Sequence, residues 1–406
     1  MKHPMRKALT AVLAMAMPVC GGLMPGVQTA EAAQGRSSSS IYDSYITSIP
    51  LSDAAKHMAE APVGGSTALI PAVSGKTVNV ADYGANGGDR SSDTEAIQKA
   101  IQALGGAGTI LFPAGTFYCA DIKVPSNVTL LSMTTFGFDG NGATQLVRNK
   151  ANASCILDLT GSQNVTVYGI SIDGMSKSVQ STVHGVKAVN AKNILVANCR
   201  INACNGSAVL VDKSTGVTVR GSMLCGSAYG VGAISGSDIL VYDNWLTSCH
   251  PAGYFAQSGV TSARVTANRI EWCGTGVLLD GASGQTIAGN YFDRCSIGGI
   301  RATGGKNIQM LGNINQRNGV LHGTDESCNL YLNGVSGAVY RGNVMEAIRG
   351  DGNDTNVTPE TAMIIRNLKD SQIVYNTAYK GFTHDLLKDY GGHSGTTVSN
   401  NVGTKY

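Results

Sequence analysis

The chain contains 406 residues, of which 52 are glycine and only 14% are charged, and its formal net charge is +3. Many glycines and few charges are typical of a turn-rich β protein. The sequence lacks the basic stripe that a nucleic-acid partner requires. Beyond its N-terminal segment, it has no apolar run long enough to span a bilayer.

The N-terminal segment has the three parts of a secretory signal. A basic start ending at Lys7 precedes an apolar run from Ala8 to Met17, and Ala30-Glu31-Ala32 is a small-x-small cleavage site. Pro18 interrupts the apolar run before it reaches the length of a membrane span. We therefore expect a secreted or periplasmic protein. The predicted parts are a signal peptide at residues 1–32, a leader at 33–76 and one domain at 77–406.

A short helix is predicted near the start of this domain. Ser92 and Glu95 have the spacing of a capping box. Apolar residues then recur on one helical face until Leu104, and Gly105-Gly106 ends the segment. We expect a helix over Ser92–Leu104.

From Asn193 to Asn318 the sequence repeats itself about every 23 residues. Each repeat holds apolar runs of three to five residues between Gly, Asn, Ser and Thr, which indicates three short strands and three turns. The leucine-spaced consensus of leucine-rich repeats is missing. A fixed period of short strands predicts an all-β fold, a single-stranded right-handed parallel β-helix with coils about 4.8 Å apart. The Ser92–Leu104 helix would close its open end.

Cysteines mark the repeats, and asparagines lie five residues before most of the later markers. The markers are Cys204, Cys225, Cys249, Cys273 and Cys295, followed by Asn318; the asparagines are Asn244, Asn268, Asn290 and Asn313. Equivalent residues stack in a β-helix, so we expect asparagines at one turn and a buried cysteine ladder. Stacked side chains point the same way, which suits free thiols better than disulfides.

Residues 78–117 resemble the N-terminal signature of the pectate-lyase-like superfamily. The matching stretches are Val78–Asp89, Ser92–Leu104 and Gly108–Phe117. The superfamily includes polygalacturonases, rhamnogalacturonases, alginate epimerases and phage tailspikes. The resemblance implies a parallel β-helix and a polysaccharide partner, and it leaves open lyase, hydrolase, epimerase and binding roles.

Strand alternation in the repeats predicts two outward rows of side chains after the markers. The first row is Lys187, Leu210, Phe255, Leu278, Arg301 and Tyr331. The second is Val189, Asp212, Gln257, Asp280, Thr303 and Asn333. Cations, carboxylates, an amide and aromatics on one face resemble a sugar-binding surface, although a solvated face explains them equally well. We expect substrate contacts from Asp212, Phe255, Gln257 and Asp280.

Longer repeats place insertions near residues 174–183, 319–328 and 349–361. Loops of this kind can wall a groove on a rigid scaffold. His184 and His322 lie on or beside two insertions, so we expect them at the substrate site, although each histidine alone is more often structural. His250 lies just before the Tyr254 strand.

A polysaccharide lyase that cleaves a uronate-containing glycan by β-elimination is the leading hypothesis. This chemistry needs a base, a group that neutralises the uronate carboxylate and a proton donor. The candidate catalytic residues are Lys187 or His250 as base, Arg301 as neutraliser and Tyr331 as donor. Asp212 and Asp280 would supply oxygen ligands if the enzyme used Ca²⁺.

Two other enzymes and one binding role remain as alternatives. A glycoside hydrolase needs two carboxyl groups within about 10 Å, whereas Asp212 and Asp280 are three coils, about 14 Å, apart. Such an enzyme would need Asp173 and a loop carboxylate instead. An alginate-type epimerase resembles the strand ending at Asp212, but Lys213 and Ser214 follow it where that family has proline and histidine. A non-catalytic glycan-binding or structural β-helix protein is the remaining alternative.

Overall fold

The computed structural model describes residues 75–132, 144–175, 181–319, 326–346, 359, 361–379 and 385–403. All of them fall in one of the two compact units of the chain, Val63–Tyr406. The predicted signal peptide and residues 33–74 of the predicted leader lie outside the described residues. No described helix is long and apolar enough to cross a membrane.

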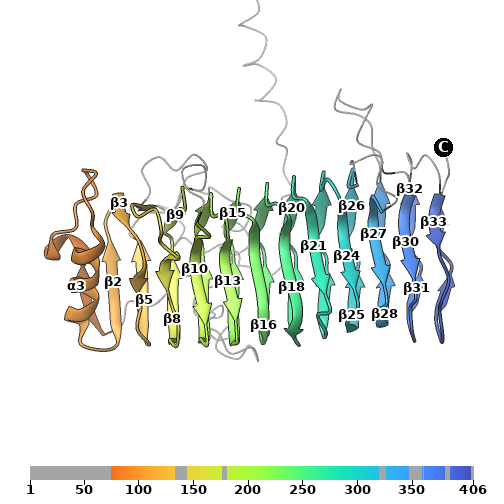
Figure 1. Ribbon diagram of the computed structural model, residues 1–406, viewed down its shortest axis with the longest axis horizontal. Helices are drawn as coiled ribbons and strands as arrows, with labels where there is room; N and C mark the ends of the chain where they lie inside the picture. Colours follow the sequence, from red (N-terminus) through yellow and green to blue (C-terminus); the bar gives the residue numbers. More distant parts are fainter. Residues whose placement is uncertain are drawn as a thin grey trace, which may run out of the picture. The chain divides into compact units, whose positions relative to one another are not determined.

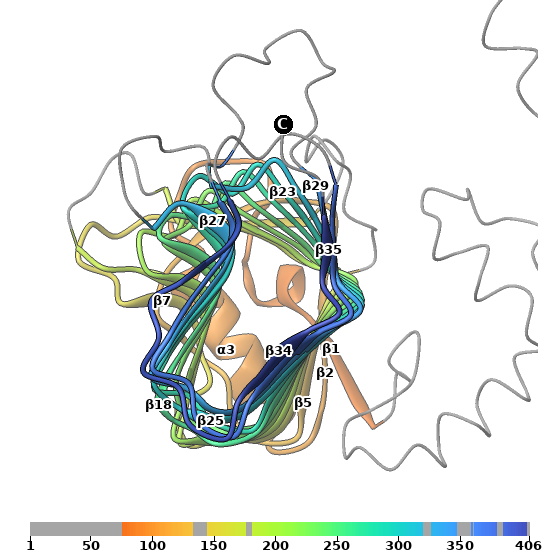
Figure 2. The same cartoon turned by 90° about the vertical axis from the view of Figure 1, so that its right-hand side faces the viewer.

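Short strands stack in parallel, coil upon coil, and each strand pairs with the equivalent strand of the neighbouring coil (Figure 1). Each regular coil contributes one strand to each of three stacks, so the coils superimpose when viewed end-on (Figure 2). The first two stacks form one 23-stranded sheet and the third forms a 12-stranded sheet. The predicted right-handed parallel β-helix is therefore confirmed.

The first stack comprises β4 (Ile122–Lys123), β7 (Cys155–Asp158), β10 (His184–Val189), β13 (Ser207–Asp212), the first half of β16 (Tyr229–Tyr242), β18 (Ala252–Val260), β21 (Thr275–Asp280), β24 (Gly298–Thr303), β27 (Cys328–Asn333), β30 (Thr361–Arg366) and β33 (Asp385–Asp389). The second comprises β1 (Lys76–Asn79), β2 (Gly108–Phe112), β5 (Val128–Ser132), β8 (Gln163–Tyr168), β11 (Lys192–Ala197), β14 (Ser214–Arg220), the second half of β16, β19 (Ala263–Thr266), β22 (Gln285–Ala288), β25 (Lys306–Leu311), β28 (Ser336–Arg341), β31 (Gln372–Val374) and β34 (Thr397–Ser399). The third comprises β3 (Gly115–Cys119), β6 (Thr144–Arg148), β9 (Ser171–Asp173), β12 (Arg200–Asn202), β15 (Met223–Cys225), β17 (Trp245–Thr247), β20 (Arg269–Glu271), β23 (Tyr291–Asp293), β26 (Ile314–Gln316), β29 (Val344–Glu346), β32 (Thr377–Tyr379) and β35 (Val402–Gly403).

The helix α3 (Thr94–Leu104) covers the N-terminal end of the stack, next to the 3₁₀ turn η2 (Val80–Tyr83). Its apolar face, including Ile97 and Ile101, is buried against the first coils. The predicted capping box is wrong: Asp93 is the N-cap, and its carboxylate accepts hydrogen bonds from the main-chain N–H groups of Asn86 and Tyr118 instead of capping the helix. The Asp93 carboxylate therefore ties the start of the helix to β3 and to the loop after η2.

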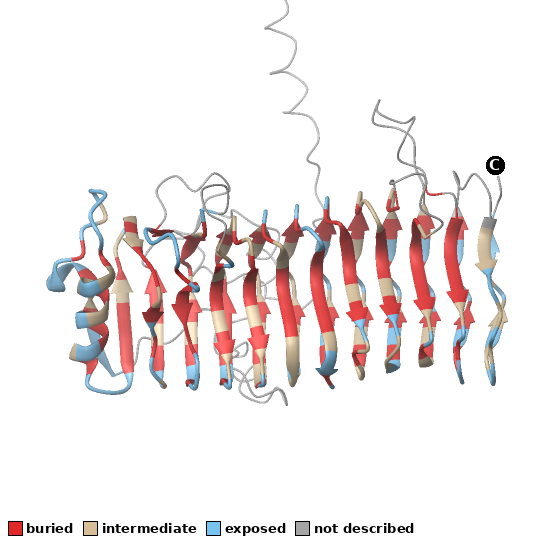
Figure 3. Ribbon diagram, viewed as in Figure 1, coloured by how far each residue is buried: buried red, intermediate tan, exposed pale blue. Residues whose placement is uncertain are grey.

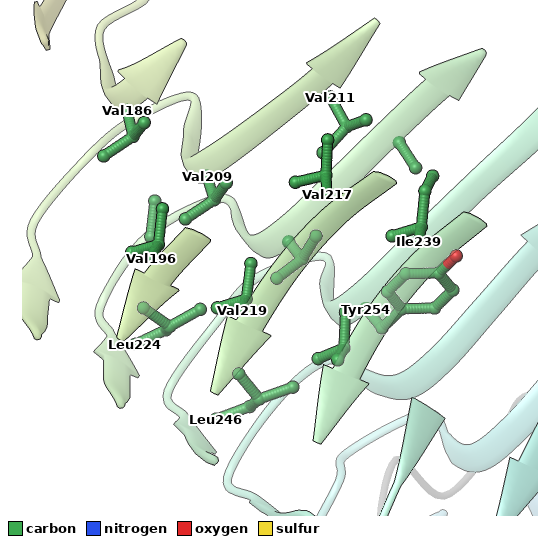
Figure 4. Close-up of a cluster of buried hydrophobic side chains, with 14 of the residues drawn as sticks. Val186, Val196, Val209, Val211, Val217, Val219, Leu224, Ile239, Leu246 and Tyr254 are labelled. Carbon is green, nitrogen blue, oxygen red and sulfur yellow. The ribbon is translucent and has the colours of Figure 1, made fainter. Parts of the chain in front are cut away.

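Aliphatic side chains from all three stacks fill the interior in continuous rows. Val209, Val217, Leu224 and Tyr254 illustrate the packing in the middle of the stack (Figure 4), and all are fully buried. Burial is concentrated on the strands, whereas exposed residues gather at the turns (Figure 3). Burying each such side chain stabilises the fold by roughly 1.5–3 kcal/mol. Strands of only three residues can therefore hold their place in the stack.

Asparagines form the predicted ladder at the turn between the second and third stacks. Asn268 is typical: its Nδ2 donates to the carbonyl oxygens of Val241 (2.9 Å) and Thr266 (3.0 Å), and its Oδ1 accepts from the main-chain N–H of Asn244 (3.0 Å). The same pattern continues coil by coil through Asn290, Asn313, Asn343 and Asn376. The ladder supplies partners to turn N–H and C=O groups that are buried away from water.

The cysteine ladder is confirmed with one correction. Cys204, Cys249, Cys273 and Cys295 are fully buried, and every described cysteine is a free thiol. Cys225 does not belong to the ladder, because on β15 it pairs in register with the outward residues Asn202 and Thr247. Its place is taken by Ser227, whose Oγ accepts the main-chain N–H of Cys204 (3.2 Å). The ladder therefore reads Cys204, Ser227, Cys249, Cys273 and Cys295 on consecutive coils.

Candidate functional site

The first stack presents the predicted outward rows in nearly the predicted order. The strand register aligns Phe255 with Leu278, Leu278 with Arg301, and Arg301 with Tyr331. Gln257 likewise aligns with Asp280 in the second row. Gly232, which the sequence analysis left out, stands in the first row one coil before Phe255.

An aromatic pair lies at the centre of this face. The rings of Tyr229 and Phe255 stack with centroids 4.7 Å apart and an interplanar angle of 18°. Gly232 packs closely beside them, because a Cβ there would lie 2.3 Å from Ser207 Oγ and 3.5 Å from Tyr229 Cβ. Tyr229 was missed because it lies three positions before Gly232, outside both predicted rows, where strict strand alternation does not predict an outward side chain.

A cluster of four side chains lies two coils beyond Phe255. Arg301 donates from Nη1 to the main-chain oxygen of Glu326 (2.7 Å) and from Nη2 to its carboxylate (2.5 Å). The guanidinium carbon lies 4.2 Å from the centroid of the Tyr331 ring, and Arg366 lies 5.6 Å from the same centroid. Tyr331 Oη donates to Glu326 Oε1 (3.1 Å).

The contacts within this cluster limit the exposure of Arg301 and Tyr331 to solvent and set the protonation state of Tyr331. The Arg301 side chain is 13% exposed, and Tyr331 is 4% exposed. Burial, and next the Glu326 carboxylate, raise the pKa of Tyr331, which keeps its hydroxyl protonated. Glu326 is 42% exposed and is the most accessible member of the Arg301–Glu326 pair. Glu326 and Arg366 were both missed, since each follows an insertion that breaks the 23-residue period.

His184 lies at the other end of the face, with its ring half buried beneath Ser207. Its Nδ1 accepts the main-chain N–H of Ser207 (2.9 Å), and a Cβ on Gly206 would lie 2.7 Å from the ring. Burial, and next the positive charge of Lys187, lower the pKa of His184 to about 4. The imidazole is therefore neutral at physiological pH and serves as an acceptor for a strand N–H.

The remaining predicted site residues are distributed along the face. His250 is exposed at the turn before β18, and its main-chain N–H donates to Ser227 O (3.0 Å). Asp212 Oδ1 accepts from Ser235 Oγ (2.7 Å), whereas Asp280 is exposed. His322 and the middle of its insertion, residues 320–325, lie outside the described residues, as do residues 176–180 and nearly all of 349–361.

The register decides which candidates can act together. Lys187 and Arg301 are five coils apart, about 24 Å by the strand spacing, so they cannot serve one sugar ring. His250 precedes the Phe255 strand, only two coils from Arg301. Asp212 and Asp280 stand three coils apart and cannot ligate one Ca²⁺. Within the described ranges, no group of three or more His, Cys, Asp or Glu side chains could hold a metal ion.

The outer face of the third stack carries a second polar network that the sequence analysis missed. Glu271 and Asp293 pair in register on adjacent coils and are nearly buried. Glu271 accepts from Trp245 Nε1 (2.8 Å) and Arg269 Nε (2.9 Å). Arg294 and Arg317 both bind Asp293, with Arg317 Nε 2.8 Å from its Oδ1. Side-chain donors from arginine and tryptophan therefore occupy both carboxylates.

Comparisons with known proteins agree with this fold. A family model described as "Periplasmic copper-binding protein (NosD)" matches residues 140–297. An iota-carrageenase from Alteromonas macleodii is 46% identical over 52 residues, which are 12% of this chain and 11% of that relative. The chain thus matches about a tenth of the length of that curated relative.

Three solved structures show the likeness over most of the chain. The A-module of the mannuronan C-5 epimerase AlgE6 from Azotobacter vinelandii superimposes with a TM-score of 0.56 and 17% identity over 81% of this chain and 100% of that one. Gene product 12 of bacteriophage phi29 gives a TM-score of 0.65 and 16% identity over 76% of this chain and 46% of that one. A family 28 exopolygalacturonase from Yersinia enterocolitica gives a TM-score of 0.54 and 11% identity over 82% and 78%.

The coil stack, its asparagine ladder and these likenesses define a protein with the right-handed parallel β-helix fold. The resemblance seen in residues 78–117 is thereby confirmed at the level of fold. At identities of 11–17%, the likeness concerns the fold alone.

Proposed function

We propose that the protein is an exported polysaccharide lyase that binds a uronate-containing glycan along the outer face of the first stack. The observation that carries this proposal is the placement of the Tyr229–Phe255 ring pair two coils from the Arg301 cluster on one face. Aromatic rings offer apolar surface to sugars, and arginine binds carboxylates in fixed geometry. The mannuronan epimerase and the exopolygalacturonase, both named for uronans, share this fold.

The chemistry proposed is β-elimination close to Arg301. A uronate carboxylate would bind the Arg301 guanidinium in exchange for the carboxylate of Glu326, which is the more exposed partner. Neutralising that carboxylate acidifies the neighbouring carbon-bound proton, so that a base can remove it. His250 is better placed than Lys187 to be this base, because it is nearer to Arg301. Release of Glu326 would also free the Tyr331 hydroxyl to donate a proton to the leaving oxygen.

A glycoside hydrolase is the second candidate, and the described residues favour it less. The outward carboxylates Asp212 and Asp280 stand too far apart, and the closer pair on the third stack is occupied by arginine and tryptophan donors. A non-catalytic glycan-binding protein would use the same aromatic and cationic face without turnover.

The test is incubation of the purified protein with acidic and neutral polysaccharides, recording the ultraviolet absorbance of unsaturated uronate together with new reducing ends. A lyase produces both signals in equal molar amounts. Reducing ends without absorbance would identify a hydrolase, and binding without either signal would identify a glycan-binding protein. Either of these results would overturn the proposed β-elimination. Arg301→Ala tests the same site by mutation. Its matched control is Arg264→Ala, which removes an exposed arginine from the second stack and leaves the proposed face intact.

A further inference from the structure

Three inward rows of the β-helix change to asparagine in one coil. On the third stack, Asn315 follows Phe292 in register and precedes Met345. In the cysteine ladder, Asn318 follows Cys295, and its Oδ1 accepts the main-chain N–H of that cysteine (2.9 Å). On the first stack, Asn329 follows Gly299 in the inward row. Asn315, Asn318 and Asn329 have no accessible surface at all.

The hydrogen bonds of this coil are incomplete. Asn318 Nδ2 donates to Phe292 O (3.3 Å) and to Asn329 Oδ1 (3.1 Å). Asn315 Nδ2, Asn315 Oδ1 and Asn329 Nδ2 have no partner among the described residues. Such buried amide atoms are costly and are rare in folded proteins unless a water molecule or an ion satisfies them.

Gly299 is the point at which the three asparagines meet. A Cβ at this position would lie 2.4 Å from Asn315 Oδ1, 3.4 Å from Asn318 Nδ2 and 3.0 Å from the main-chain oxygen of Asn329. The missing side chain therefore leaves room for the amide of Asn315. The three polar groups converge on one place inside an otherwise apolar core.

A fourth group belongs to the same region. Tyr340, on β28 of the same coil as Asn329, is fully buried, and its hydroxyl has no partner among the described residues. Burial, and next the thiol of Cys328 beside Asn329, raise its pKa, so the hydroxyl stays protonated. Four of the ten buried side-chain atoms without a partner thus come from the consecutive strands β26, β27 and β28.

We propose that Asn315, Asn329 and Tyr340 enclose an internal hydration site that holds one or two ordered water molecules. The unpartnered set contains amide N–H donors, one amide oxygen acceptor and a hydroxyl. A ligand must therefore both accept and donate hydrogen bonds. A metal cation would face the N–H donors, and an anion would face Asn315 Oδ1. Water matches both sides of the set, and a buried water typically makes about three hydrogen bonds.

The site has a structural consequence for the candidate functional face. The Asn318–Asn329 hydrogen bond joins the turn after β26 to the start of β27, across the predicted insertion. The strand β27 carries Tyr331, and Glu326 lies just before it. A hydrated amide cluster therefore fixes the beginning of β27 where the chain re-enters the stack.

The direct test is a crystal structure of the unmodified protein that resolves buried water. Density within hydrogen-bonding distance of both Asn315 and Asn329 is the expected result. A dry site, in a map that shows ordered water elsewhere, would overturn the proposal.

Thermal unfolding of two variants gives a second readout. In a hydrated site, Asn315→Val removes the amide N–H and the amide oxygen of Asn315 from the hydrogen bonds of the water, so we expect Tm to fall by about 2–4 °C. In the double variant, the second substitution Asn329→Ala should recover part of that loss of Tm. Alanine is chosen because Ala362 is the equivalent residue on the next coil. In a dry site, Asn315→Val removes two unsatisfied atoms and would raise Tm, which would contradict the proposal. If a variant does not fold, the crystal structure of the unmodified protein decides the question.

Discussion

Arg301 and Glu326 lie 25 residues apart in the sequence, and the guanidinium of Arg301 binds both the main-chain oxygen and the carboxylate of Glu326. The pair joins the middle of the first stack to the end of an insertion. The Tyr331 ring packs against the guanidinium and its hydroxyl donates to the same carboxylate. Arg301 therefore contacts three groups on the face proposed to bind the glycan: the main-chain oxygen of Glu326, its carboxylate and the ring of Tyr331.

Replacing Arg301 should affect function more than stability. We expect Arg301→Ala to lower glycan turnover or binding at least tenfold, because the carboxylate of the substrate loses its partner. The free energy of unfolding should fall by only about 1–2 kcal/mol, since Glu326 is partly exposed and can be hydrated. Activity assays and urea unfolding measure the two quantities. Wild-type activity in Arg301→Ala would contradict this site, and the loops near His184 and His322 would be the next candidates.

The aromatic pair provides a separate test of the same face. Phe255→Ala removes one ring of the Tyr229–Phe255 stack, and we expect glycan affinity to fall about tenfold, as the loss of 1–1.5 kcal/mol of ring contact implies. Isothermal titration with the substrate found in the screen measures this loss. Val339→Ala, on the outer side of the second stack, is the control for lost apolar area. Equal affinities of both variants and the unmodified protein would argue against a sugar platform here.

His184 should make stability depend on pH. The folded pKa of about 4 lies below the unfolded value of 6.5, so the unfolded chain binds more protons between these values. Stability from this group is complete above pH 6.5 and is lost as pH falls towards 4, up to about 3 kcal/mol. Urea unfolding at pH 7 and pH 5 should show a smaller difference for His184→Gln than for the unmodified protein. Equal pH dependence in the two proteins would contradict this account.

The asparagine ladder should contribute strongly to stability. Asn268→Ala removes donors from two carbonyl oxygens and an acceptor from the N–H of Asn244, all buried. We expect the free energy of unfolding to fall by about 3 kcal/mol, measured by chemical denaturation. The exposed second-stack substitution Gln309→Ala should change it by less than about 0.5 kcal/mol. A loss below 1 kcal/mol in Asn268→Ala would show that water replaces the ladder bonds.

Cys225 and Cys273 should behave differently although both mark the repeat. Cys273 is buried in the core, and burial raises its pKa well above the ordinary value, so it should resist alkylation until the protein unfolds. Cys225 lies on the outer face and should react first in the native state. Mass spectrometry of peptides alkylated before and after unfolding, without reductant, measures both. A cysteine that stays unmodified after unfolding would reveal a disulfide and contradict the free-thiol ladder.

The sequence alone was sufficient for the fold because a solenoid is determined locally. Each coil contacts mainly its neighbours, so a period of about 23 residues is enough to specify parallel stacking, the asparagine turn and the outward rows. The same local rule failed at Cys225. Its spacing from Cys204 looked periodic, yet only the strand register shows that Ser227 occupies the inward position.

Only the tertiary structure shows which side chains are in contact across the insertions and across the core. Glu326 reaches Arg301 because an insertion returns the chain to the first stack, and no spacing rule predicts where it re-enters. Asn315, Asn318 and Asn329 belong to three different rows and meet only when three stacks enclose one interior. Periodicity predicts which residues stack along the helix axis, whereas contacts across the coil depend on side-chain length and packing, which only the folded chain determines.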